Sequence, residues 1–218
     1  KIETLNQTYT VTYWSQMTQN PSVCIVACSV LKRELQQLKT EGKLDVDLVF
    51  VSKNFHIDYG LLENNLRKVL EHTKKRFKGK IILVYGDLCL GQDNEMKKLA
   101  DEFGVTKIDA QNCVDCQLGG KGIVNTVDPN HNLMFMGPGM IEFFQDMKPK
   151  MIQEGLDEIT FQNMFSGIKG FVILDTCGDG EKIVDAMKKA GLNTPVIENR
   201  KIGTQNVLRV GTDAIERS

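Results

Sequence analysis

The sequence predicts a three-layer α/β protein in which helices flank a mainly parallel sheet. Two observations support this prediction. Short apolar runs rich in Val and Ile recur along the chain, and most are followed by a segment with apolar residues at helical spacing. Repeated strand–helix alternation favours parallel strands joined by crossover helices. The chain has 218 residues, 41% of them hydrophobic, which is enough to bury a core without disulfide bonds.

The first predicted unit is strand, helix, strand over residues 22–52. Its first strand is the apolar run SVCIVAC, its helix follows from the leucine spacing in VLKRELQQL, and its second strand is DVDLVFVS. Asp58 is the expected cap of the next helix. That helix ends in the basic run KKRFKGK (74–80), because positive charge suits the carboxyl end of a helix.

The clearest strand in the sequence is KIILVYGDLCLG (80–91). The helix DNEMKKLADEFG follows it, with Asp93 as the expected cap and Gly104 as the stop. A later helix is expected from Met140, and Pro149 should end or restart it. The remaining predicted elements are strands at 106–110, 133–139, 170–176, 195–199 and 206–210 and a helix at 181–191.

We expect residues 1–20 to be an N-terminal extension and residues 21–218 to form a single α/β domain. No change in composition marks a linker, and residues 140–168 are the best candidate for a helical cap or a hinge. The net charge is −1, from 27 Lys and Arg against 28 Asp and Glu, which argues against a nucleic-acid or polybasic membrane surface. No apolar run reaches the ~18 residues of a transmembrane helix. We therefore expect a cytoplasmic protein.

The cysteines are the strongest candidates for chemistry. An intracellular chain with six cysteines more often holds reduced thiols or metal ligands than disulfides. Cys28, Cys89 and Cys177 each follow a predicted strand and precede a predicted helix. Ligands of open parallel sheets bind beyond the carboxyl ends of the strands, so these thiols should lie along one edge. Their position at helix amino ends would also favour the thiolate.

Cys113 and Cys116 form a C-x2-C pair directly after the predicted strand TKIDA. This spacing is common in thiolate metal sites, but it equally suits a redox pair. His56 lies just past the second strand and is a further candidate ligand, although a lone histidine is more often unremarkable. Cys24 lies inside an apolar strand and is expected to be a core residue.

Glycine-rich turns offer backbone N–H groups that could hold a phosphate-bearing cofactor. The candidate residues are Gly86 in YGDLCLG and Gly119 and Gly120 in LGGKG. None of these turns matches a Walker A or a dinucleotide-binding fingerprint, and tight strand–helix turns are the simpler interpretation.

Several stretches together resemble a known family: ACSVLKREL, NFHIDYGLLENNL, ILVYGDLCLG, NCVDCQLGGKG, DPNHNLMFMGPGMIEFF and FVILDT, in this order. The sequence is similar over residues 22–176, and more weakly beyond them, to the domain-of-unknown-function 1638 family, DUF1638. This family is frequent in methanogenic archaea and anaerobic bacteria.

The resemblance implies that Cys28, His56, Cys89 and Cys116 match family positions, with Asp115 before the last of them. The neighbouring Cys113 resembles a feature of a methanogen-type branch. Members tend to be encoded beside corrinoid-dependent methyltransferase systems. The resemblance therefore implies a methyltransferase, or a protein accessory to one, with a corrinoid protein or a methyltransferase as partner.

Three hypotheses follow. The first is a metal-binding protein in which Cys28, Cys89, Cys113 and Cys116 bind one metal at the carboxyl edge, with His56 as an alternate ligand or a neighbour of the ligands. Zinc is the default metal for such a set, and an iron–sulfur cluster is the main alternative. The second is a non-catalytic interaction module for a corrinoid protein or a methyltransferase. The third is a thiol redox protein that uses the C-x2-C pair.

Overall fold

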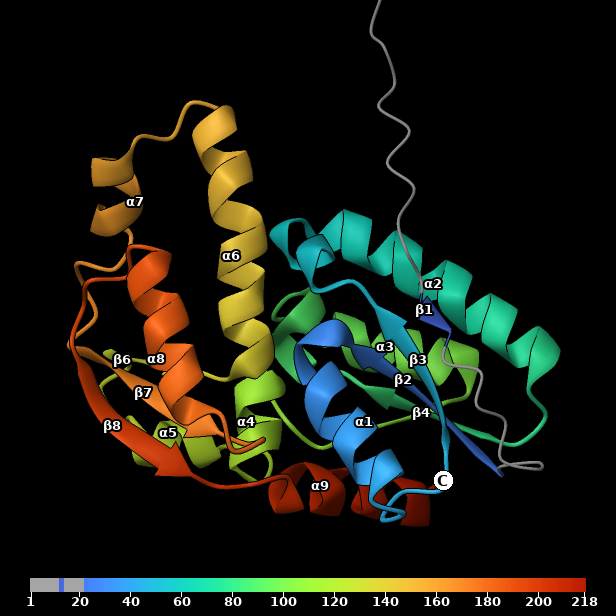
Figure 1. The fold of residues 1–218 in the computed structure, drawn as a ribbon. Helices are drawn as coiled ribbons and strands as arrows, with labels where there is room; N and C mark the ends of the chain where they lie inside the picture. Colours follow the sequence, from blue (N-terminus) through green and yellow to red (C-terminus); the bar gives the residue numbers. More distant parts are fainter. Residues whose placement is uncertain (1–11, 14–21) are drawn as a thin grey trace, which may run out of the picture.

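The structure, a computed structural model, describes residues 12–13 and 22–218. The predicted α/β class is confirmed, with parallel strands flanked by helices (Figure 1). The strands form two sheets instead of one. Sheet A has the order β1-β3-β2-β4-β5, with β1 antiparallel to β3 and the other neighbours parallel, and sheet B has the parallel order β6-β7-β8. Of the expected N-terminal extension, 1–20, all but Thr12 and Tyr13 lies outside the described residues.

The strands are β1 (Thr12–Tyr13), β2 (Val23–Cys28), β3 (Asp47–Val51), β4 (Lys80–Val84), β5 (Thr106–Lys107), β6 (Leu133–Met136), β7 (Gly170–Asp175) and β8 (Val196–Lys201). The α-helices are α1 (Lys32–Thr40), α2 (Tyr59–Arg76), α3 (Glu95–Phe103), α4 (Cys113–Leu118), α5 (Ile123–Val127), α6 (Pro138–Gln153), α7 (Glu158–Asn163), α8 (Gly180–Lys189) and α9 (Gln205–Glu216). Three short 3-10 helices complete the described elements: η1 (Ser29–Leu31), η2 (Lys53–Ile57) and η3 (Asp87–Leu90).

Strands β2, β3 and β4 of sheet A are buried on both faces, and their side chains alternate between two cores. Ile25 and Ala27 of β2 pack in the core that also contains α1 and α9. Val26 and Cys28 face the opposite side and pack with α2 and α3. This alternation follows from the two-residue period of a strand, and it explains why β2 and β4 read as continuous apolar runs.

Helix α9 corrects one sequence prediction, because NVLRV (206–210) was expected to be a strand. Val207, Val210 and Ala214 are buried in the core of sheet A at the spacing of one helix face. The five-residue window NVLRV contains two valines and a leucine and satisfied the strand pattern. The helical period becomes visible only over a longer segment.

Two helix boundaries also differ from prediction. Asn94, in a left-handed conformation with φ 62°, is the N-cap of α3 in place of Asp93. Helix α6 continues through Pro149. Proline removes one backbone hydrogen bond, and the carbonyl that loses its donor belongs to Gln145, which is exposed. The Lys148 ammonium donates to the carbonyl of Ala190 at 2.8 Å and holds this end of α6 on the fold.

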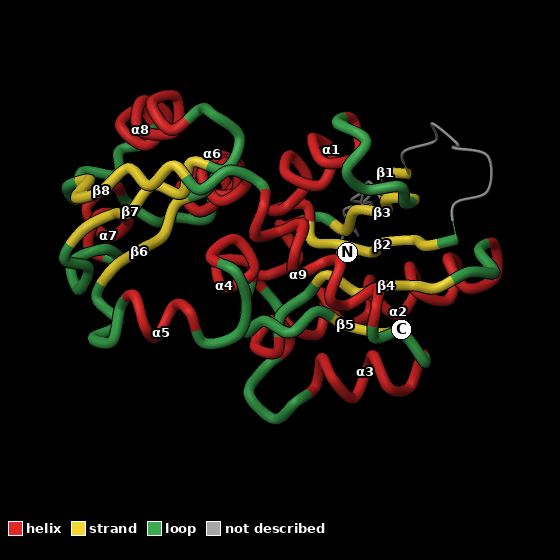
Figure 2. Tube along the Cα trace, turned by 90° about the horizontal axis from the view of Figure 1, so that it is seen from below, coloured by secondary structure: helices red, strands yellow, loops and turns green. Residues whose placement is uncertain are grey.

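Helices α6 and α4 lie between the two sheets (Figures 1 and 2). We call this boundary the seam, and its polar contacts include those of Glu34 with Gln117 and Thr176. The first turn of α6 presses on η1 so closely that a Cβ on Gly139 would overlap the carbonyl of Val30. Across the seam, the buried carboxyl of Glu34 on α1 accepts hydrogen bonds from Gln117 at 2.7 Å and Thr176 at 2.8 Å. In the described part of the chain, no helix is long and apolar enough to cross a membrane.

Candidate functional site

A small cavity lies at the carboxyl edge of sheet A, where the ends of β2 and β4 meet η2, η3 and α4. Its volume is about 10 Å³, close to the room that a single water molecule needs. Three apolar side chains form part of its wall. The polar side chains that line it come from five separate segments and are Cys28, His56, Tyr85, Cys89 and Cys113.

Close backbone packing brings Cys89 and Cys113 together. Gly86, which precedes η3, lies so near the loop after β5 that a Cβ on it would overlap the backbone of Gln111. Two hydrogen bonds of 2.9 Å, from Asp87 N to Ala110 O and from Leu88 N to Gln111 O, then tie η3 to this loop. Cys89 in η3 and Cys113 at the start of α4 therefore face one cavity, although they are 24 positions apart in the printed sequence.

Cys28 and His56 reach the same cavity from the ends of neighbouring strands. The Ser29 hydroxyl accepts a hydrogen bond of 2.8 Å from the backbone N–H of Lys53, which joins the end of β2 to the start of η2. His56 in η2 is thereby directed inward, and its Nδ1 lies 3.8 Å from the Cys28 sulfur. Its ring stacks on that of Tyr85, with centroids 5.9 Å apart and an interplanar angle of 10°.

Burial keeps the thiols of the cavity protonated at neutral pH. Burial raises the pKa of Cys28 to about 12 and that of Cys89 to about 11. Burial also raises the pKa of Cys113, and the neighbouring thiols of Cys28 and Cys89 add to this. The expectation that helix amino ends would favour thiolate was therefore wrong, because the loss of hydration outweighs the local dipole. Burial lowers the pKa of His56, which keeps its imidazole neutral.

The Tyr85 hydroxyl is a buried polar group without a well-formed hydrogen bond among the described residues. The Cys28 sulfur lies close enough to act as a weak acceptor for it. A buried hydroxyl that lacks a strong partner costs free energy, about 1–3 kcal/mol. A thiolate in the cavity, in place of a thiol, would give this hydroxyl a charged acceptor.

Cys116 does not line the cavity. The C-x2-C segment forms helix α4, and Cys116 lies one turn beyond Cys113, which is a separation of about 5 Å along the helix. Its side chain is only 1% exposed and packs in the core beneath sheet A, near Glu34 and Asp115. The sequence pattern could not reveal this, because it does not distinguish a helix from the turn in which both sulfurs face one ion.

The other candidate residues lie in different places. Gly86 borders the cavity, whereas Gly119 and Gly120 line a separate pocket beside α9, so these three glycines do not form one cofactor site. Cys177 follows β7 of sheet B and therefore does not share the edge of sheet A. Cys24 is 2% exposed and lies within the core that contains α2 and α3.

The cavity side chains are not arranged as a complete coordination sphere. In the described residues, no group of three or more His, Cys, Asp and Glu side chains has the geometry to hold a metal ion. All six cysteines are free, so no disulfide joins the described thiols.

Sequence reasoning missed two residues near the site. Tyr85 forms a wall of the cavity, and the signal for it was its place at the end of the apolar run, directly before Gly86. Glu34 is fully buried among Cys113, Cys116 and Cys177, and burial raises its pKa. No sequence signal marked Glu34, because a glutamate in an amphipathic helix ordinarily faces solvent.

Comparison with known families gives one match. The family model described as "Protein of unknown function (DUF1638)" matches residues 50–203, a range that includes His56, Cys89, Cys113 and Cys116 and begins after Cys28. No curated protein matches the chain. Because the match spans well over half of the 218 residues, the chain belongs to the DUF1638 family.

Proposed function

We propose that this protein binds one metal ion through Cys28, Cys89, Cys113 and His56, at the carboxyl edge of sheet A. The observation that carries the proposal is the convergence of three thiols and a neutral imidazole on one small cavity. Three thiolates and one imidazole form a common zinc ligand set, so zinc is the expected metal and an iron–sulfur cluster is the alternative.

The distance between the Cys28 sulfur and His56 Nδ1 is consistent with this ligand set. In a tetrahedral zinc site, bond lengths of about 2.3 Å to sulfur and about 2.0–2.1 Å to nitrogen place the two ligand atoms about 3.6 Å apart. The Cys28 sulfur and His56 Nδ1 are 3.8 Å apart. Binding would then require Cys89 and Cys113 to turn their side chains toward the same point, and both are only partly buried.

The protonation state of these thiols argues against a role as free nucleophiles. Thiols with pKa values of about 11 and about 12 are inert as nucleophiles at neutral pH. A divalent cation stabilises the thiolate directly and can displace such protons. A zinc ion that kept one position open would supply Lewis-acid chemistry at this edge.

The test is metal analysis of protein purified without oxygen. We expect one metal ion per chain in the wild type and loss of most of it in Cys28→Ser, Cys89→Ser and Cys113→Ser. Cys116→Ser and Cys24→Ser are matched controls, since both side chains lie outside the cavity, and they should retain the metal. An absorption spectrum separates the two metals, because thiolate–iron charge-transfer bands are visible and zinc is silent. Metal-free wild-type protein with a native fold, or full metal content in Cys89→Ser, would refute the proposal.

A thiol redox function remains as a second candidate, and one observation favours it. Cys113 is partly exposed at the first position of α4 and Cys116 is buried one turn later, which is the arrangement of many redox C-x2-C pairs. This function predicts a reversible Cys113–Cys116 disulfide, lost in Cys116→Ser. Metal binding that survives Cys116→Ser, together with failure to form the disulfide, would exclude it.

The family resemblance extends the proposal to a partner. We propose that the metal site serves corrinoid-dependent methyl transfer, in contact with a corrinoid protein or a methyltransferase. Co-purification of such a partner with the wild type, weakened in Cys89→Ser, would support this role for the site. An interaction that is unaffected by every cavity substitution would instead favour a non-catalytic interaction module.

A further inference from the structure

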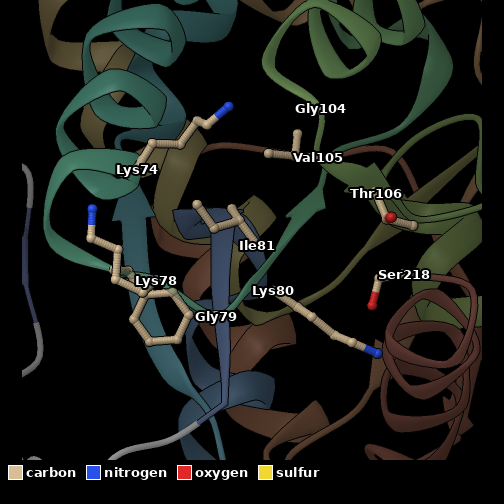
Figure 3. Close-up of a pocket in the computed structure, with 10 residues that line it drawn as sticks. Lys74, Lys78, Gly79, Lys80, Ile81, Gly104, Val105, Thr106 and Ser218 are labelled. Atoms are coloured by element: carbon tan, nitrogen blue, oxygen red, sulfur yellow. The ribbon is translucent and has the colours of Figure 1, made fainter.

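A second pocket lies at the amino edge of sheet A, opposite the thiols (Figure 3). Its volume is about 360 Å³, within the range of about 300–1,000 Å³ that is typical of small-molecule sites. Three lysines, Lys74, Lys78 and Lys80, line it. No Asp or Glu side chain is among the described residues of its wall.

The backbone that carries these lysines is fixed by close packing. Helix α2 ends at Arg76, and the chain enters β4 at Lys80, whose N–H donates to the carbonyl of Ser22 at 2.9 Å. A Cβ on Gly79 would overlap that same carbonyl, so only glycine fits the turn. The lysines on either side of Gly79 are therefore presented from a turn of defined shape.

The positive charge of the pocket exceeds what its surroundings neutralise. The Lys74 ammonium donates to Phe103 O at 2.6 Å and the Lys80 ammonium to Ile215 O at 3.4 Å, and both acceptors are at helix carboxyl ends. The ends of α2, α3 and α9 contribute about −0.5 charge each, about half of what the three lysines carry. Between described residues, none of the ion pairs involves Lys74, Lys78 or Lys80.

The pocket also has an apolar side. Phe77, Ile81 and Val105 contribute to its wall. Figure 3 shows Ile81 between the side chains of Lys78 and Lys80. The hydroxyl groups of Thr106 and Ser218 lie on the side to which Lys80 extends. If the lysines served only to neutralise the carboxyl ends of the helices, no hydroxyl or aromatic group would be needed beside them. A cavity that joins basic, hydroxyl and aromatic groups has the composition of a binding site.

We propose that this pocket binds a small phosphate-bearing molecule with an aromatic or apolar portion, the chemistry of a nucleotide. The lysine ammonium groups and the Thr106 hydroxyl would hold the phosphate oxygens, and the Phe77 ring would contact the flat portion. The ligand would bind at the edge opposite the thiols, so this inference is independent of the metal site.

Calorimetric titration with ADP, pyrophosphate and adenosine tests the proposal. We expect saturable ADP binding at one site per chain, weaker binding of pyrophosphate, which lacks the apolar portion, and the weakest binding of adenosine, which lacks the charge. ADP affinity should fall as salt is added, because the ammonium groups are exposed. Binding should persist in Cys89→Ser, which separates failure of this inference from failure of the metal proposal.

The decisive variant is Lys78→Gln with Lys80→Gln. Its matched control is Lys182→Gln with Lys189→Gln, which removes the same charge from exposed positions on α8. We expect at least a ~10-fold loss of ADP affinity in the first pair and less than a ~2-fold change in the second, with unchanged circular dichroism in both. Absence of saturable ADP binding, equal loss in the two pairs, pyrophosphate binding as tight as ADP, or adenosine binding as tight as ADP would each overturn the proposal.

Discussion

Replacing Glu34 by glutamine should remove a pH dependence from the stability of the fold. Glu34 is 0% exposed, and burial raises its pKa above the ordinary value of 4.5. The folded state therefore holds its proton over a pH range in which the unfolded chain releases it. By proton linkage, this part of the stability is fully present below about pH 4.5 and is lost as the pH rises toward the folded-state pKa.

The size of this change in stability follows from the single proton that Glu34 binds in the folded state. Across the interval between the two pKa values, the wild-type free energy of unfolding should fall by up to about 1.4 kcal/mol per pH unit. The amide of Glu34→Gln can keep the accepting oxygen that receives Gln117 and Thr176, and its NH2 group replaces Oε2, which has no partner among the described residues. The variant should therefore equal the wild type near pH 4.5 and exceed its stability at higher pH.

Urea unfolding followed by circular dichroism, at steps from about pH 5 to about pH 8, measures this difference. Burial also lowers the pKa of His56, but this shift contributes equally to both proteins and cancels in the comparison. Glu41→Gln is the control, because Glu41 is exposed near the end of the same helix and should give no rising gain in stability. A constant difference between wild type and Glu34→Gln at every pH would show that Glu34 is ionised in the folded state and would refute the reasoning.

Three further outcomes follow from the packing and the thiols. Gly139→Ala should lower the free energy of unfolding by about 1–3 kcal/mol, because the added Cβ would overlap the backbone of η1. The control Gly167→Ala should be nearly neutral, since its Cβ would meet open space. Equal effects of the two substitutions in urea unfolding would contradict the close contact. Cys89 has a pKa of about 11 against an ordinary 9.0. In metal-free protein at pH 8 it should therefore be alkylated about 100-fold more slowly than an unfolded cysteine. Equal rates in mass spectrometry would argue against its burial. Asp115→Ala should cost about 3 kcal/mol, since its carboxylate accepts backbone N–H bonds from Gln111, Gly122 and Val124; an unchanged thermal midpoint would count against this role.

The strand–helix units could be predicted from sequence because each is a local pattern. The apolar run of β2 and the Asp58 cap of α2, whose carboxylate accepts from Leu61 N at 2.6 Å, are both visible within about one turn of chain. The placement of Cys28 and Cys89 at one edge also followed, because parallel strands carry the residues after them to the same side.

The remaining features depend on contacts between distant segments. Whether Cys177 shared the edge with Cys89 depended on which strands pair, and the division into two sheets is not written in any local pattern. Helix α4 forms between Asn112, which caps it, and Gly119. Packing of this helix against distant segments decides that Cys113 faces the cavity and Cys116 the core with α1 and α9. The burial of Glu34 could not be predicted from the sequence, because its hydrogen-bond partners Gln117 and Thr176 are 83 and 142 positions away.

Helix α9 completes the core of sheet A although the whole of sheet B intervenes in the chain. During synthesis, the side of sheet A that α9 covers therefore stays open to water until residues 205–216 emerge. Leu35 and Leu38 are among the apolar side chains on that side. A chain cut after residue 203 would leave this surface permanently uncovered, and we expect it to aggregate or to require a chaperone. In the sequence, sheet B is therefore inserted between the strands of sheet A and helix α9. Helix α9 can pack on sheet A only after the residues of sheet B have been synthesised.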